Sequence, residues 1–154
     1  MTSNAGRVRF PIDGSLFLQD STVGSQSSTT ASQNQLNLER MTGWWNSAGD
    51  IAINQEFMVV IDVSAVDVDT SQTYIFTGRV SAAANMSSPQ IVETIPTIGA
   101  TGIFYMPISR EMLKGTSVTD PKYFDINMTV GGSGTKEITY TAYVAPFPQS
   151  GGNV

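Results

Sequence analysis

Two residue types on which much protein chemistry depends are missing from this chain. Its 154 residues include no histidine and no cysteine. Without histidine the sequence lacks the commonest general base and metal ligand, which excludes Ser-His-Asp triads and histidine-ligated zinc. Without cysteine, disulfides, iron–sulfur clusters and thiol catalysis are excluded as well. We therefore expect no catalytic residues, no cofactor and no bound metal, and we predict that the protein is not an enzyme.

Carboxylates are the remaining groups that could support catalysis or bind a cation. The motif Asp67-Val-Asp69, preceded by Asp62, offers oxygen ligands of the kind that Ca²⁺ prefers. No glycine or glutamate follows at the spacing of a calcium loop, so we interpret the motif as a polar turn between strands. A glycosidase needs two paired carboxylates. Nothing in the sequence pairs any two of the other candidates, which are Glu39, Asp50, Glu56, Glu93, Glu111 and Glu137.

Aromatic residues are better candidates for binding a partner than for catalysis. The rings of Trp44 and Trp45 would point to opposite sides of an extended backbone. The pair can be interpreted as core packing, as an anchor in a protein interface or as a platform on which a sugar stacks. Two tyrosines, Tyr105 and Tyr143, are expected on an outer sheet face that could serve as a subunit interface, because Phe104 and Tyr140 lie on the opposite sides of the same strands.

The two ends of the chain read as extended arms on either side of one domain. Residues 1–14 form a polar N-terminal arm, in which Arg7, Arg9 and Phe10 could contact a neighbouring subunit. Residues 15–145 form the folded domain, and residues 146–154 form a C-terminal tail rich in proline and glycine. In that tail Phe147 stands between two prolines, on a stiff segment that could lie across a partner.

Composition excludes two classes of partner. Only 14% of the residues are charged, the net charge is −5 and the pI is about 4.4, which is not the basic footprint of a nucleic-acid binder. No apolar run approaches the roughly 20 residues that a membrane helix needs. We thus expect a soluble protein, made in the cytoplasm, that binds neither nucleic acid nor membrane. Seventeen serines and seventeen threonines stand where charges are usually found, which suits the outer faces of a β-protein.

Alternating side chains predict four strong strands, each rich in β-branched and aromatic residues. The first is apolar on both faces at its start, which predicts a central strand. A Gly-Gly-Ser-Gly run at residues 131–134 joins the last two, and we expect it to form the turn of a hairpin. The four segments are 57–66, 74–82, 124–130 and 138–144.

Weaker patterns complete the expected fold. Residues 20–35 have almost no apolar side chains and should form a loop or a solvent-facing strand. Met112 and Leu113 fit a single helical turn capped by Ser109. Four weaker strands are expected at 15–19, 35–40, 90–95 and 101–108. About eight strands with little helix predict an all-β fold, a two-sheet antiparallel β-sandwich or jelly roll with extended N- and C-terminal arms.

The order of these features resembles a family of small jelly-roll cement proteins of tailed-phage capsids, the family of the Bordetella phage cementing protein. The likeness spans roughly residues 15–145 and is one of pattern and order. It rests on the segments Asp20-Ser21, Asn34-Gln-Leu-Asn-Leu38, 49–63, 73–81, 88–94, Gly102-Ile-Phe-Tyr-Met-Pro107, 123–133 and Ile138-Thr-Tyr-Thr-Ala142.

The resemblance implies a structural virion protein on the outer surface of a phage capsid. Its partner would be the major capsid protein, whose neighbouring subunits it would tie together, and it would act as a homo-oligomer, with a trimer favoured. Under this hypothesis the interface residues would be Arg7, Arg9, Phe10, Trp44, Trp45, Tyr105, Tyr143 and Phe147. Two alternatives stay open, a carbohydrate-binding, lectin-like module suggested by the tryptophan pair and a receptor-binding or tail-associated β-sandwich.

Overall fold

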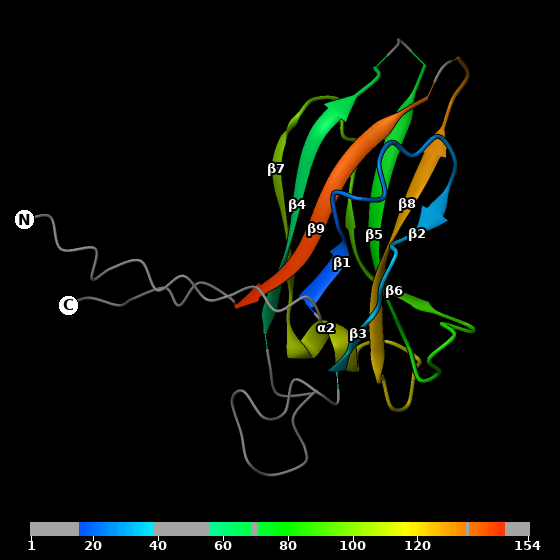
Figure 1. Cartoon of the computed structure of the whole chain (residues 1–154). Helices are drawn as coiled ribbons and strands as arrows, with labels where there is room; N and C mark the ends of the chain where they lie inside the picture. Colours follow the sequence, from blue (N-terminus) through cyan, green and yellow to red (C-terminus); the bar gives the residue numbers. More distant parts are fainter. Residues whose placement is uncertain (1–15, 39–55, 69–70, 135, 147–154) are drawn as a thin grey trace, which may run out of the picture.

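A computed structural model of the chain describes residues 16–38, 56–68, 71–134 and 136–146. Within these ranges the chain forms nine strands and one short helix (Figure 1). The predicted N-terminal arm, residues 1–14, and residues 147–154 of the predicted tail, 146–154, lie outside the described residues. The predicted start of the tail at Pro146 is wrong, because Pro146 is the last residue of β9. The elements are β1 (Phe17–Gln19), β2 (Thr30–Ala31), β3 (Leu36–Asn37), β4 (Phe57–Val66), β5 (Thr73–Ser81), β6 (Gln90–Ile95), β7 (Gly102–Ile108), α2 (Arg110–Lys114), β8 (Tyr123–Gly131) and β9 (Ile138–Pro146).

The strands form two antiparallel sheets that pack face to face. The four-stranded sheet has the order β1-β9-β4-β7, and the five-stranded sheet has the order β2-β8-β5-β6, with β3 also paired to β8. Because β2 and β3 pair with successive parts of the same edge of β8, they act as one interrupted edge strand. This leaves four strand positions in each sheet, which is the arrangement of a jelly roll. The predicted all-β sandwich of about eight strands is therefore confirmed.

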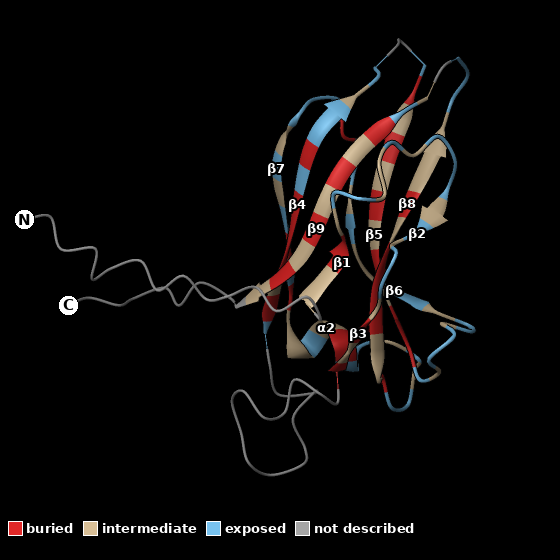
Figure 2. Ribbon diagram, viewed as in Figure 1, coloured by how far each residue is buried: buried red, intermediate tan, exposed pale blue. Residues whose placement is uncertain are grey.

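The core lies between the sheets and follows the alternation seen in the sequence. In β4, Phe57, Val59, Ile61 and Val63 are buried in the core, and β5 buries alternate residues in the same way (Figure 2). The core positions of β8 are Phe124, Ile126 and Met128. The rings of Phe57 and Phe124 meet edge to face across the sandwich, at 5.2 Å between centroids. As predicted, β4 is central, since β9 and β7 pair with its two edges.

The predicted hairpin between the last two strands is wrong. Strand β8 belongs to the five-stranded sheet and β9 to the four-stranded sheet, so the connection between them joins the two sheets. This corner packs on the end of the connection between β4 and β5, where the Ser71 hydroxyl donates to the Ser133 carbonyl at 3.1 Å. Gly132 has φ 86°, and a Cβ there would lie 1.6 Å from the Ser71 carbonyl oxygen. The glycines thus permit a close crossing of two corners, not a two-residue turn.

A single helical turn closes one end of the sandwich, as the sequence predicts. The Ser109 hydroxyl caps α2 by accepting from the Met112 N–H at 3.3 Å. Leu113 is fully buried and anchors the turn to the core. Among the described residues no helix is long and apolar enough to cross a membrane.

Candidate functional site

The outer face of the four-stranded sheet carries a row of apolar side chains. Val60 in β4 is in register with Tyr105 in β7 on one side and with Tyr143 in β9 on the other. Phe17 in β1 is in register with Tyr143. Residues paired across antiparallel strands share a face of the sheet, so the row Phe17–Tyr143–Val60–Tyr105 runs across all four strands. The prediction that Tyr105 and Tyr143 lie on one outer face is confirmed.

Apolar residues also flank this row along the strands. Met58 pairs with Pro107 and Ala145 on one side of the row, and Ile103 pairs with Asp62 on the other. Each of these residues alternates with a core residue of its own strand, which places it on the outer face. We call the whole surface the apolar face, and it consists of Phe17, Met58, Val60, Ile103, Tyr105, Pro107, Tyr143 and Ala145.

The apolar face is accessible, and its side chains are large. Tyr105 is 60% exposed and Ile103 is 55% exposed, which makes them two of the four exposed large hydrophobic residues of the described chain. Towards the centre of the row the surface is packed, with Val60 only 6% exposed and the rings of Phe17 and Tyr143 5.9 Å apart. Contiguous exposed apolar surface of this kind is typical of binding sites in soluble proteins.

Charge is nearly absent from the four strands that build the apolar face. Asp62 is the only Asp, Glu, Lys or Arg in β1, β4, β7 and β9. It is exposed beside Ile103 at one end of the face. Covering such a surface costs little charge desolvation, which is the main penalty for burying polar protein surface.

The outer face of the five-stranded sheet has the opposite character. Its central positions in β5 and β8 carry threonine, asparagine, arginine and aspartate, and several of these side chains form hydrogen bonds within or between the two strands. The Thr77 hydroxyl donates to the Asn127 carbonyl at 3.3 Å, and the Asn127 amide donates to the Thr129 hydroxyl at 3.2 Å. This polar surface is already satisfied within the sheet and suits contact with water.

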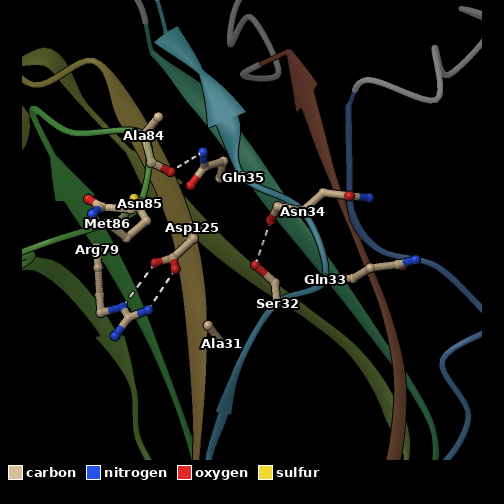
Figure 3. Close-up of a pocket in the computed structure, with 10 residues that line it drawn as sticks. All are labelled: Ala31, Ser32, Gln33, Asn34, Gln35, Arg79, Ala84, Asn85, Met86 and Asp125. Carbon is tan, nitrogen blue, oxygen red and sulfur yellow. Dashed lines mark hydrogen bonds and ion pairs between the residues drawn. The ribbon is translucent and has the colours of Figure 1, made fainter.

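A polar pocket opens on this second face, between residues 31–35 and residues 84–86, with a volume of about 580 Å³. Figure 3 shows Arg79 and Asp125 side by side in this pocket. The Arg79 Nε donates to Asp125 Oδ1 at 2.9 Å and Nη2 donates to Oδ2 at 2.6 Å, which makes a two-pronged ion pair. The Asp125 side chain is 4% exposed and the Arg79 side chain 19%, so the pair is mostly removed from water.

The sequence did not predict this pair, although a signal for it was present. Arg79 and Asp125 occupy outward positions of two predicted strands, and opposite charges on neighbouring strands often pair. The pair forms because β5 and β8 are adjacent in the register that places Arg79 opposite Asp125, and the sequence does not reveal that pairing. Phe17 was missed for a different reason, because β1 is only three residues long and gives almost no periodic pattern.

Six of the eight predicted interface residues lie outside the described residues, and only Tyr105 and Tyr143 are placed by the structure. Asp69 and the candidate carboxylates Glu39 and Asp50 also lie outside. The remaining carboxylates are spread over separate elements, with Glu93 in β6 and Glu111 in α2. In the described ranges no group of three or more acids gathers as a metal site would require. Six interface candidates remain unplaced, namely Arg7, Arg9, Phe10, Trp44, Trp45 and Phe147.

Comparisons of the chain with protein families, with curated proteins and with solved structures find no match. The function is therefore inferred from the chemistry of the two surfaces, the apolar face and the polar pocket.

Proposed function

We propose that this protein is a structural virion component, a cement or decoration protein that binds the outer surface of a phage capsid. In this role it ties neighbouring major capsid protein subunits together and performs no chemistry. The apolar face is the observation that carries the proposal. Tyr105 and Ile103 are exposed on it, and its four strands hold only one charged residue. Such a surface is suited to being covered by another protein. The likeness in strand order to the cement family of tailed phages supports the same role.

The energetics of such a clamp require no single strong contact. An interface of about 800 Å² on each partner is enough for stable association. A cement that contacts several subunits at once gains further through effective concentration, by about a hundredfold or more. The tyrosines of the apolar face suit this use, since tyrosine buries a large area and loses little side-chain entropy.

Capsid binding by substituted proteins tests the proposal. Particles assembled from the major capsid protein encoded nearest to this gene are mixed with the purified protein and sedimented. The wild type should co-sediment, and Tyr105→Asp should weaken binding by at least about tenfold because it would bury an unpaired charge.

A matched control separates the apolar face from exposed hydrophobic residues in general. Ile91 is 62% exposed in β6, on the other sheet, so Ile91→Asp makes a comparable change away from the apolar face. It should bind like the wild type. Equal binding by the Tyr105→Asp protein, or no co-sedimentation of the wild type at any salt concentration, would overturn the proposal.

The homo-oligomer is part of the same proposal. We infer that the cement acts as a small closed assembly, with a trimer favoured, because several copies held together provide the avidity that a capsid clamp uses. The mass of the purified protein by light scattering tests this, and a monomer at every concentration would contradict it.

A further inference from the structure

The floor of the polar pocket offers hydrogen-bond donors without net charge. Arg79 pairs with Asp125 through Nε and Nη2, which leaves Nη1 with no hydrogen-bond partner among the described residues. Because the carboxylate balances the guanidinium, the floor carries no net charge. A charged ligand would gain little here, and an anion would also be repelled by Asp125.

The walls of the pocket are lined by primary amides that offer both donors and acceptors. The Gln35 amide N–H donates to the Ala84 carbonyl and so ties the two walls together. The Asn85 side-chain oxygen accepts from the Ser87 N–H at 3.1 Å, whereas the Asn34 side chain points away from the pocket and donates to the Phe17 carbonyl at 3.2 Å (Figure 3). The Gln35 and Asn85 amides thus each use one end for a bond within the protein and leave the other end available to a ligand.

The loop that forms one wall is held in a strained conformation. Met86 has φ 51° and Ser88 has φ 48°, in the left-handed region that residues with a side chain rarely adopt. Such strain persists where the surrounding structure enforces it, and it is frequent at sites that clamp a ligand. Here the Ser81 hydroxyl donates to the Ser87 carbonyl at 2.8 Å and anchors this loop to the end of β5.

We propose that this pocket binds a neutral saccharide, a function separate from capsid binding. Saccharide hydroxyls both donate and accept, which matches the free side-chain carbonyl oxygen of Gln35 and the free amide N–H of Asn85. The volume of about 580 Å³ is in the range of small-molecule sites, about 300–1,000 Å³. Ala31, Ala84 and Met86 supply the small apolar contacts that the C–H faces of a sugar need, and no large apolar subsite suits a peptide side chain.

A glycan array with a blocking variant tests this proposal. The array carries neutral hexose and N-acetylhexosamine oligosaccharides together with sialylated and sulfated ones. Wild-type protein should bind neutral glycans in preference to the acidic ones. Ala84→Trp fills the pocket from an exposed position and should lower the signal by at least about tenfold.

Two further variants make the result specific to this pocket. Ala82→Trp places the same ring at an exposed position of the same loop outside the pocket, and it should bind like the wild type. Asn85→Ser keeps an oxygen that can accept from the Ser87 N–H but removes the amide, and it should bind several-fold more weakly. Thermal unfolding of each protein verifies that all of them fold.

The saccharide proposal fails if no neutral glycan binds, if acidic glycans bind better, or if Ala84→Trp binds glycans as well as Ala82→Trp does. Binding of peptides in place of glycans, abolished by Ala84→Trp, would overturn it too. The Ala84→Trp protein should co-sediment with capsids as the wild type does. Glycan binding therefore tests the saccharide proposal and co-sedimentation tests the cement proposal, so the failure of one is distinguished from the failure of the other.

Discussion

At the scale of single residues, two buried tyrosines illustrate how the same side chain can have opposite effects on stability. The Tyr74 hydroxyl donates to the Asp67 carbonyl at 2.7 Å and is 3.2 Å from the Glu137 carbonyl, so it links the connection after β4 to the start of β9. Tyr140 is 2% exposed, stacks edge to face on Phe76 at 4.8 Å, and its hydroxyl has no partner among the described residues. A buried hydroxyl without a partner costs free energy.

We predict that Tyr140→Phe stabilises the fold by about 1 kcal/mol, whereas Tyr74→Phe destabilises it by about 1–2 kcal/mol. The first change removes an unsatisfied hydroxyl and keeps the ring on Phe76, while the second removes a bonded hydroxyl. Urea unfolding of both variants at neutral pH measures the two effects. Loss of stability in Tyr140→Phe would contradict this account.

The same residue predicts a dependence of stability on alkaline pH. Burial raises the pKa of Tyr140 above its ordinary value, and the negative charge of Asp125 raises it further. In the unfolded chain a tyrosine loses its proton near pH 10, so above that pH the unfolded state is favoured and stability falls. The stability gap between Tyr140→Phe and the wild type should therefore widen above about pH 10, as measured by urea unfolding from pH 7 to 11. A constant difference in stability between the two proteins would contradict this account, because Tyr140 would then ionise in the folded state as freely as in the unfolded chain.

At the scale of elements, strands were predictable and their partners were not. Alternation in the sequence places 57–66 at the bounds of β4, because one buried face imposes a period of two. The connection at 131–134 was predicted wrongly because a glycine-rich run has the same local chemistry in a hairpin and in a corner between sheets. Which of the two forms depends on strands far away in sequence, here on the corner around Ser71 that the glycines allow to approach.

Three glycine substitutions measure how much that corner contributes. Gly99→Ala should change stability by less than about 0.5 kcal/mol, since Gly99 has open space around it. Gly24→Ala should cost about 1–2 kcal/mol, because Gly24 has φ 72° but no neighbour within 4 Å of an added Cβ. Gly132→Ala adds a collision with the Ser71 backbone to the unfavourable φ, so we expect a loss of at least about 3 kcal/mol. Urea unfolding provides the comparison, and a Gly132 effect no larger than that of Gly24 would refute the corner-packing explanation.

At the scale of the whole molecule, the two proposed binding surfaces lie on the outer faces of different sheets. The alternation of aromatic residues around Tyr105 and Tyr143 was readable from the sequence, since it depends only on neighbours in the chain. The apolar face as a surface was not, because it requires the order β1-β9-β4-β7 that brings Phe17 and Ile103 onto the same sheet face. The polar pocket likewise depends on segments about 50 residues apart, since Gln35 meets Ala84 across it.

Salt distinguishes binding through the apolar face from binding through the charged N-terminal segment. If the apolar face carries the cement function, binding depends on the removal of apolar surface from water, and Asp62 adds only a small charge effect. We therefore predict that co-sedimentation with capsids is unchanged or stronger between about 0.1 and 1 M NaCl, over which the screening length falls from about 10 to 3 Å. Binding dominated by Arg7 and Arg9 against an acidic neighbour should instead weaken over that range.

An Arg7→Gln/Arg9→Gln protein is the matched control. It should show the same salt response as the wild type if the apolar face dominates binding. If wild-type binding instead falls steeply with salt and binding of this variant does not, the arginines and not the apolar face carry the contact with the capsid.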